Sequence, residues 1–92
     1  MTKDEYQKKA EAGEAVLIDI REPDELVAEP SPEGAINIPM STLPQAEAEG
    51  KLPKDKLVVT LCRSGGRCQP VNAFLREHGY QADFIEGGML GW

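Results

Sequence analysis

Hydrophobic positions along the chain fall into short apolar runs separated by polar or amphipathic segments. Residues 15–20 and 57–61 are nearly continuous apolar runs of strand length, rich in β-branched side chains. Such runs are typical of strands in a parallel sheet whose two faces are both covered. Two shorter runs, at residues 35–38 and 82–85, predict short additional strands.

Helical patterns alternate with these runs. Thr2 and Glu5 form a capping-box pattern, which predicts a helix running toward Gly13. A short helical turn is expected at residues 23–28, and a weak, acidic helix at residues 41–50. These segments would carry the chain between successive strands.

The clearest amphipathic helix follows residue 66. Val71, Phe74 and Leu75 lie at helical spacing, and Gly79 is expected to end the helix. Strands alternating with helices predict an α/β fold with a central, mainly parallel sheet, helices on both faces and right-handed crossovers. Active sites in such folds lie beyond the carboxyl ends of the strands.

Length and composition predict one globular domain, residues 1–92. The chain is 40% hydrophobic and 28% charged, which is ordinary for a folded protein. The apolar runs are too short to span a membrane, and the first residues are too polar for a secretory signal. A cytoplasmic location is therefore expected.

Charge and cysteine content narrow the function further. The net charge of −6 argues against nucleic acid or an anionic membrane as a partner. Two cysteines without an export signal are expected to be reduced and functional. Their spacing matches no common zinc motif, and His78 is the single histidine, so no metal site is predicted. Nucleophilic thiol chemistry also requires no cofactor.

A small, doubly basic loop follows the apolar run at residues 57–61. Its residues are Cys62, Arg63, Ser64, Gly65, Gly66 and Arg67. A strand-to-helix turn at this position would lower the pKa of the cysteine, because backbone N–H groups and the helix dipole favour the thiolate. Both glycines can adopt backbone angles closed to other residues, which predicts a nest of inward N–H groups.

The two loop arginines are candidates for binding an anionic substrate. Their forked guanidinium groups suit a tetrahedral oxyanion. Arg67 has the stronger claim to an inward position, because it closes the loop at the start of the helix. Such a loop could stabilise a thiolate, a persulfide, or a covalent thiophosphate or thio-arsenate. A loop of only six residues suits a sulfur atom better than a phosphate group.

The chain resembles the single-domain rhodaneses, or thiosulfate sulfurtransferases, over nearly its whole length. The resemblance is carried by four segments in the family's order: residues 18–25, 34–39, 57–67 and 84–92. It implies a rhodanese-like fold in which Cys62 takes a sulfane sulfur from thiosulfate, releases sulfite and carries the sulfur as a persulfide. The acceptor would be a thiol, cyanide or a sulfur-carrier protein. It also implies that six-residue loops accompany sulfur chemistry, whereas related phosphatases and arsenate reductases have loops one residue longer.

Three departures from the family pattern are visible. Ser31 stands where many members have a histidine, Cys68 stands where many have a serine, and the chain ends at Trp92 where relatives usually continue with a helix. Pro70 fits only if the helix begins near Arg67. Cys68 is either a small side chain on the first helical turn or a resolving thiol that forms a disulfide with Cys62.

Three charged residues after the first apolar run are assigned a structural role. Asp19, Arg21 and Glu25 are expected to form an ion-pair network at the strand end. Two alternatives to a sulfurtransferase stay open: a small cysteine-dependent phosphatase or arsenate reductase, and a rhodanese-like binding module without catalytic activity. The reactivity of Cys62 toward thiosulfate would separate them.

Overall fold

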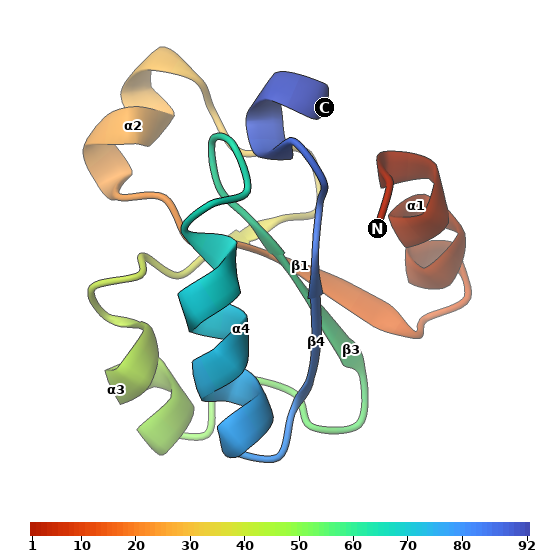
Figure 1. The fold of residues 1–92 in the computed structure, drawn as a ribbon, viewed down its shortest axis with the longest axis vertical. Helices are drawn as coiled ribbons and strands as arrows, with labels where there is room; N and C mark the ends of the chain where they lie inside the picture. Colours follow the sequence, from red (N-terminus) through yellow and green to blue (C-terminus); the bar gives the residue numbers. More distant parts are fainter.

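The computed structural model describes residues 1–92, and its four strands form one parallel sheet in the order β2-β1-β3-β4 (Figure 1). The strands are β1 (Ala15–Asp19), β2 (Ile36–Asn37), β3 (Leu57–Leu61) and β4 (Gln81–Phe84). Asp19 pairs with Leu61 on one side and Asn37 on the other, so these strands end at the same edge. The predicted α/β fold with a parallel sheet is confirmed.

Four α-helices and one 3-10 turn connect or flank the strands. They are α1 (Lys3–Glu11), α2 (Pro23–Ala28), α3 (Leu43–Ala48), α4 (Cys68–Glu77) and η1 (Gly88–Gly91). The capping box forms as predicted, because the Thr2 hydroxyl accepts from the Glu5 N–H while the Glu5 carboxylate accepts from the Thr2 N–H. None of the helices has the length and apolar character needed to cross a membrane.

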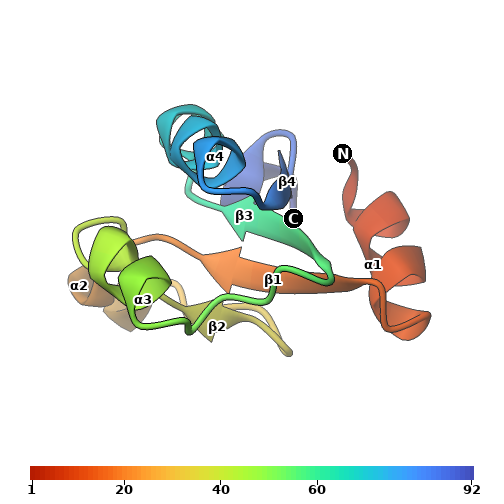
Figure 2. The same cartoon turned by 90° about the horizontal axis from the view of Figure 1, so that it is seen from below.

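Helices lie on both faces of the sheet (Figure 2). Each face has its own hydrophobic cluster. One face packs against α3 and α4 through Leu43, Val71 and Leu75. The other packs against α1 through Tyr6 and against the C-terminal segment through Trp92. Both clusters extend to the carboxyl edge of the sheet, so the loop after β3 is anchored to a rigid core.

The limits of the predicted elements differ from the observed ones by small amounts. The helix expected at residues 41–50 is confined to Leu43–Ala48, with Pro44 at its second position, where a missing N–H costs nothing. Pro70 is the third residue of α4 and is tolerated for the same reason. β2 is only two residues long and pairs with β1 alone, at one edge of the sheet.

Candidate active site

Cys62 follows β3 directly and begins a loop at the carboxyl edge of the sheet. The loop lies between α2 and η1 in Figure 1 and then enters α4. Cys62 is fully buried, whereas Arg63, Ser64 and Gly66 are exposed. The loop therefore places its sulfur inside and its polar side chains at the surface.

Backbone N–H groups surround the Cys62 sulfur. The N–H of Gly65 donates to Sγ at 3.0 Å, and the backbone N–H groups of Arg67 and Cys68 also act to lower the pKa of Cys62. Gly65 makes this possible with a φ of +99°, in the left-handed region that side chains disfavour. Gly66 does not share this conformation, so the expectation that both glycines use it is wrong. A Cβ at Gly66 would meet no close neighbour.

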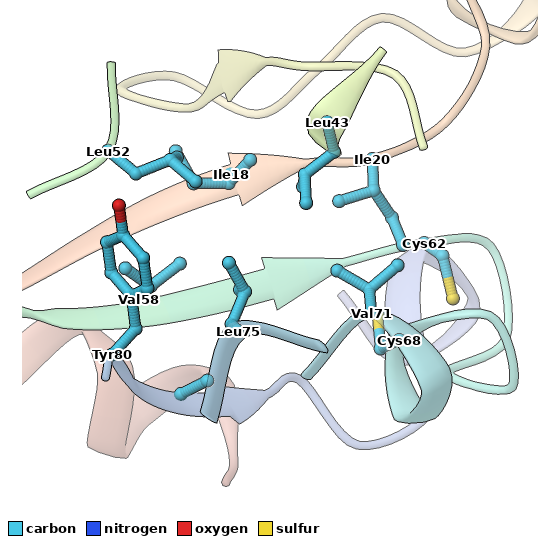
Figure 3. Packing of buried hydrophobic residues seen from close by; sticks show 11 residues of the cluster. Ile18, Ile20, Leu43, Leu52, Val58, Cys62, Cys68, Val71, Leu75 and Tyr80 are labelled. Atoms are coloured by element: carbon cyan, nitrogen blue, oxygen red, sulfur yellow. The ribbon is translucent and has the colours of Figure 1, made fainter. Parts of the chain in front are cut away.

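The thiol of Cys68 completes this environment. Its hydrogen bond to Cys62 is the largest influence on the Cys62 thiol and, with the backbone donors and against the opposing effect of burial, lowers its pKa to about 5. The same hydrogen bond, together with burial, raises the pKa of Cys68, so Cys68 is the protonated partner. Figure 3 shows the two sulfur atoms at one end of the same cluster. Both thiols are free.

Arg67 is held by α2. Its guanidinium donates to both carboxylate oxygens of Glu25, at 2.8 and 2.6 Å. This paired hydrogen bond with Arg67 is the main reason why the pKa of Glu25 is lowered to about 2. Glu25 thus joins the loop rather than the network predicted with Asp19 and Arg21. Arg67 fixes the loop against α2 and has less freedom to bind a substrate than the sequence suggested.

Arg63 is the arginine available to a ligand. Arg21, Arg67 and Arg76 each donate to an acceptor within the protein, whereas the exposed guanidinium of Arg63 does not. A cavity of about 400 Å³ begins beside it and is lined by Arg21, Glu25, Ala28, Glu29, Arg63 and Leu90. Arg67 thus takes the more inward position, as expected, while its ion pair with Glu25 leaves Arg63 as the arginine without an internal acceptor; substrate binding by either stays a prediction. Arg63 presents the free positive charge next to Cys62.

Asp19 and Arg21 form a buried ion pair at the end of β1. Arg21 donates from Nε at 3.0 Å and from Nη2 at 2.7 Å, and the Ser31 hydroxyl donates to the same carboxylate at 2.7 Å. Burial alone would raise the pKa of Asp19, but these hydrogen bonds outweigh it and lower the pKa. Two of the three predicted network residues thus meet. Ser31, which replaces the family histidine, acts as the third member.

The sequence and structural comparisons agree with this geometry. The model of the rhodanese-like domain family matches residues 2–92. The chain belongs to the rhodanese-like domain family. This rhodanese-like domain is 44% identical over 87 residues to the putative sulfurtransferase YtwF of Bacillus subtilis, covering 94% of this chain and 82% of that protein.

A second relative and a solved structure extend the match. The rhodanese-like domain is 36% identical over 87 residues to a sulfurtransferase of Allochromatium vinosum, covering 94% of this chain and 78% of that protein. The crystal structure of a rhodanese-like domain protein from Staphylococcus aureus matches with a TM-score of 0.85 at 29% identity, covering 100% of this chain and 88% of that one. These relatives support sulfurtransferase activity as the general function.

The ionisation of Cys62 gives a testable pH dependence for the rhodanese-like domain. Because the thiolate exists above a pKa of about 5, alkylation by iodoacetamide should keep its full rate down to near pH 6 and fall as the pH drops through 5. Peptide mapping after timed alkylation would follow Cys62 separately from Cys68. If the alkylation rate of Cys62 instead had its pH midpoint at about 8.5, as for an ordinary cysteine, the described stabilisation of the thiolate would be contradicted.

A second support of the loop was not anticipated from the sequence. The N–H groups of Met89 and Leu90 donate to the carbonyls of Cys62 and Arg63, at 2.9 and 3.1 Å. Gly88 lies against the same carbonyls, and a Cβ there would come within 2.2 Å of the Cys62 oxygen. The paired glycines 87–88 were the available signal, because such close backbone contact excludes a side chain.

Gly88→Ala should therefore damage the loop of this rhodanese-like domain. The added methyl group must push η1 away from Cys62, and we expect the rate of sulfur transfer to fall at least about tenfold with a stability loss of about 2 kcal/mol or more. Gly34→Ala is the matched control, because Gly34 also has a positive φ of +86° but has no neighbouring atom within 4 Å. Equal effects of the two substitutions would show that backbone strain alone is responsible.

Proposed function

We propose that this chain transfers a sulfane sulfur from thiosulfate or a related persulfide donor through a persulfide on Cys62. The observation that carries the proposal is the buried Cys62 sulfur, which accepts a hydrogen bond from the Gly65 N–H at 3.0 Å and whose pKa is lowered to about 5 by the Cys68 thiol and backbone N–H groups. An ionised sulfur is the nucleophile that the reaction needs. The chemistry requires no group beyond the chain's own thiolate.

The proposed reaction has two steps. The Cys62 thiolate attacks the outer sulfur of thiosulfate, the S–S bond breaks, and sulfite leaves with the bonding electron pair. An acceptor nucleophile, such as a thiolate or cyanide, then attacks the outer sulfur, the bond between the outer sulfur and Cys62 Sγ breaks, and Cys62 leaves with the bonding electron pair as a thiolate. N–H groups directed at the thiolate also suit a persulfide anion, because both carry one negative charge in the same turn.

The first experiment measures sulfite release and sulfur gain. The reduced protein is incubated with thiosulfate, sulfite is quantified, and intact-protein mass spectrometry with peptide mapping locates any added sulfur. Thiocyanate formation after adding cyanide measures the second step. We expect sulfite from the first step and thiocyanate from the second. Hydrolysis of an aryl phosphate without any sulfite release would overturn the proposal in favour of a phosphatase.

Arg63 is expected to attract the anionic donor. Arg63→Ala should raise the KM for thiosulfate by about threefold to tenfold with a small change in kcat, because an exposed guanidinium contributes mainly to the encounter with an anion. The difference should shrink as salt is added. Lys9→Ala removes the same charge from an exposed position on α1 and serves as the control. A KM shift of equal size in both variants would indicate only the loss of net charge.

A further inference from the structure

Cys68 places a second thiol at the sulfur that carries the chemistry. It is the first residue of α4, and it belongs with Cys62 to one buried cluster (Figure 3). Both side chains are free and have no exposed surface. Figure 3 shows both sulfur atoms at the same end of this cluster, and each thiol is the largest influence on the pKa of the other. A sulfur transfer reaction does not require this second thiol.

We propose that Cys68 resolves the Cys62 persulfide by forming an intramolecular disulfide and releasing hydrosulfide, so that the chain also acts as a dithiol-dependent reductase of sulfane sulfur. This inference rests on the proposed function, because it begins from the persulfide. It gives the chain a second product, hydrosulfide, in place of a sulfur atom transferred to an acceptor.

The step balances without an outside oxidant. The sulfur of Cys68 forms a bond with Cys62 Sγ, the bond between Sγ and the outer sulfur breaks, and the Cys68 proton leaves with the outer sulfur as HS⁻. The outer sulfur is reduced and the two cysteines are oxidised. Together with the first step, thiosulfate and two protein thiols give sulfite, hydrosulfide and one disulfide. An external thiol reductant would then restore both cysteines.

The surroundings of Cys68 suit a thiol that reacts only after the persulfide forms. In the resting protein its proton is shared with the Cys62 thiolate, the largest cause of its raised pKa. Sulfur loading moves the negative charge from Sγ to the outer sulfur, which weakens that restraint. The Thr60 hydroxyl acts in the opposite direction and lowers the pKa of Cys68.

Asn72 provides independent evidence that this buried region contains an unused hydrogen-bond donor in the resting protein. It follows Cys68 by one turn on the buried side of α4, is 1% exposed, and its Nδ2 has no hydrogen-bond partner. A buried donor without a partner costs stability unless it has some use. An unused N–H group on the face that carries Cys68 is consistent with negative charge developing there during reaction.

The test is a single turnover of the full chain without added reductant. Reduced wild-type protein and Cys68→Ser are incubated anaerobically with thiosulfate, and the sulfite and sulfide released are quantified. Each protein is then alkylated, and its mass is measured by intact-protein mass spectrometry. We expect wild type to release sulfide in step with sulfite and to become lighter by two hydrogens, with a bond between Cys62 and Cys68. Cys68→Ser, which keeps a small hydroxyl donor, should release sulfite, gain one sulfur atom and yield no sulfide.

The outcomes separate the two proposals. Sulfite release with a stable added sulfur, an alkylated Cys68 and no sulfide in wild type would overturn the resolving role and leave the sulfurtransferase intact. Absence of sulfite from both proteins would instead reject the proposed function. Wild type incubated without thiosulfate must stay fully reduced, which rules out oxidation by residual air. The wild-type result decides the matter even if Cys68→Ser folds poorly.

Discussion

Cys62→Ser should abolish sulfur transfer while the domain stays folded. Serine has nearly the same shape, but its hydroxyl does not ionise near neutral pH and cannot carry a sulfane sulfur. The N–H groups from Gly65, Arg67 and Cys68 would then surround a neutral group. Sulfite release should fall by at least about a thousandfold, since the nucleophile itself is lost.

The measurement combines sulfite release with thermal unfolding. The stability change should stay within about 1.5 kcal/mol, because the substitution replaces one small polar group by another. If Cys62→Ser retained activity, Cys68 would become the candidate nucleophile. The double variant Cys62→Ser/Cys68→Ser would test that possibility. Loss of both activity and folded structure would leave the comparison to be made with Cys62→Ala.

Asp19→Ala should have the largest effect on stability. It removes the buried counter-charge of Arg21, whose side chain is 2% exposed and would keep only the exposed Glu29 carboxylate nearby. Breaking one partner of such a pair costs about 3–5 kcal/mol, a large share of the stability of a domain this size. Chemical denaturation followed by circular dichroism would measure the loss.

Glu29→Gln is the matched control for this prediction. Glu29 also lies near the Arg21 guanidinium, at 3.7 Å, but its side chain is 52% exposed. Water screens this second pair, so its removal should cost less than about 1 kcal/mol. Similar losses in the two variants would show that burial of Asp19 has no special effect. The lowered pKa of Asp19 also means that its contribution is present above the carboxyl's ordinary pKa and is lost as the pH falls through its lowered value.

Local patterns in the sequence were sufficient to place most elements. The strand at residues 57–61 and the helical turn at residues 23–28 have the predicted limits. The signals are local: β-branched residues favour the strand, and a proline favours the start of the helix. The position of Cys62 at the carboxyl end of a parallel strand followed from the fold class. The family assignment followed from four short segments in order.

Contacts between distant segments could not be predicted in this way. Arg67 and Glu25 are 42 residues apart, and their pairing depends on how α2 lies against the loop. The contact of Gly88 with the Cys62 carbonyl likewise depends on where the chain returns after β4. For Cys68, the sequence left two roles open, because spacing alone does not show which way a thiol points. The assignment of Cys62 as nucleophile stays a prediction until its reaction with thiosulfate is measured.

The hydrogen bonds to the Cys62 sulfur come mostly from the main chain, which affects how this protein can diverge. The backbone N–H groups of Gly65, Arg67 and Cys68 all lower the pKa of Cys62, and replacing the side chain of Arg67, for example, leaves its N–H in place. Among these backbone groups, only a proline, or a side chain at Gly65 that forbids its φ, would remove a donor directly. Substitutions at the exposed rim, such as Arg63 and Ser64, can therefore accumulate without loss of the reactive thiolate. Descendants of this sequence could exchange one sulfur donor for another while retaining the same nucleophile.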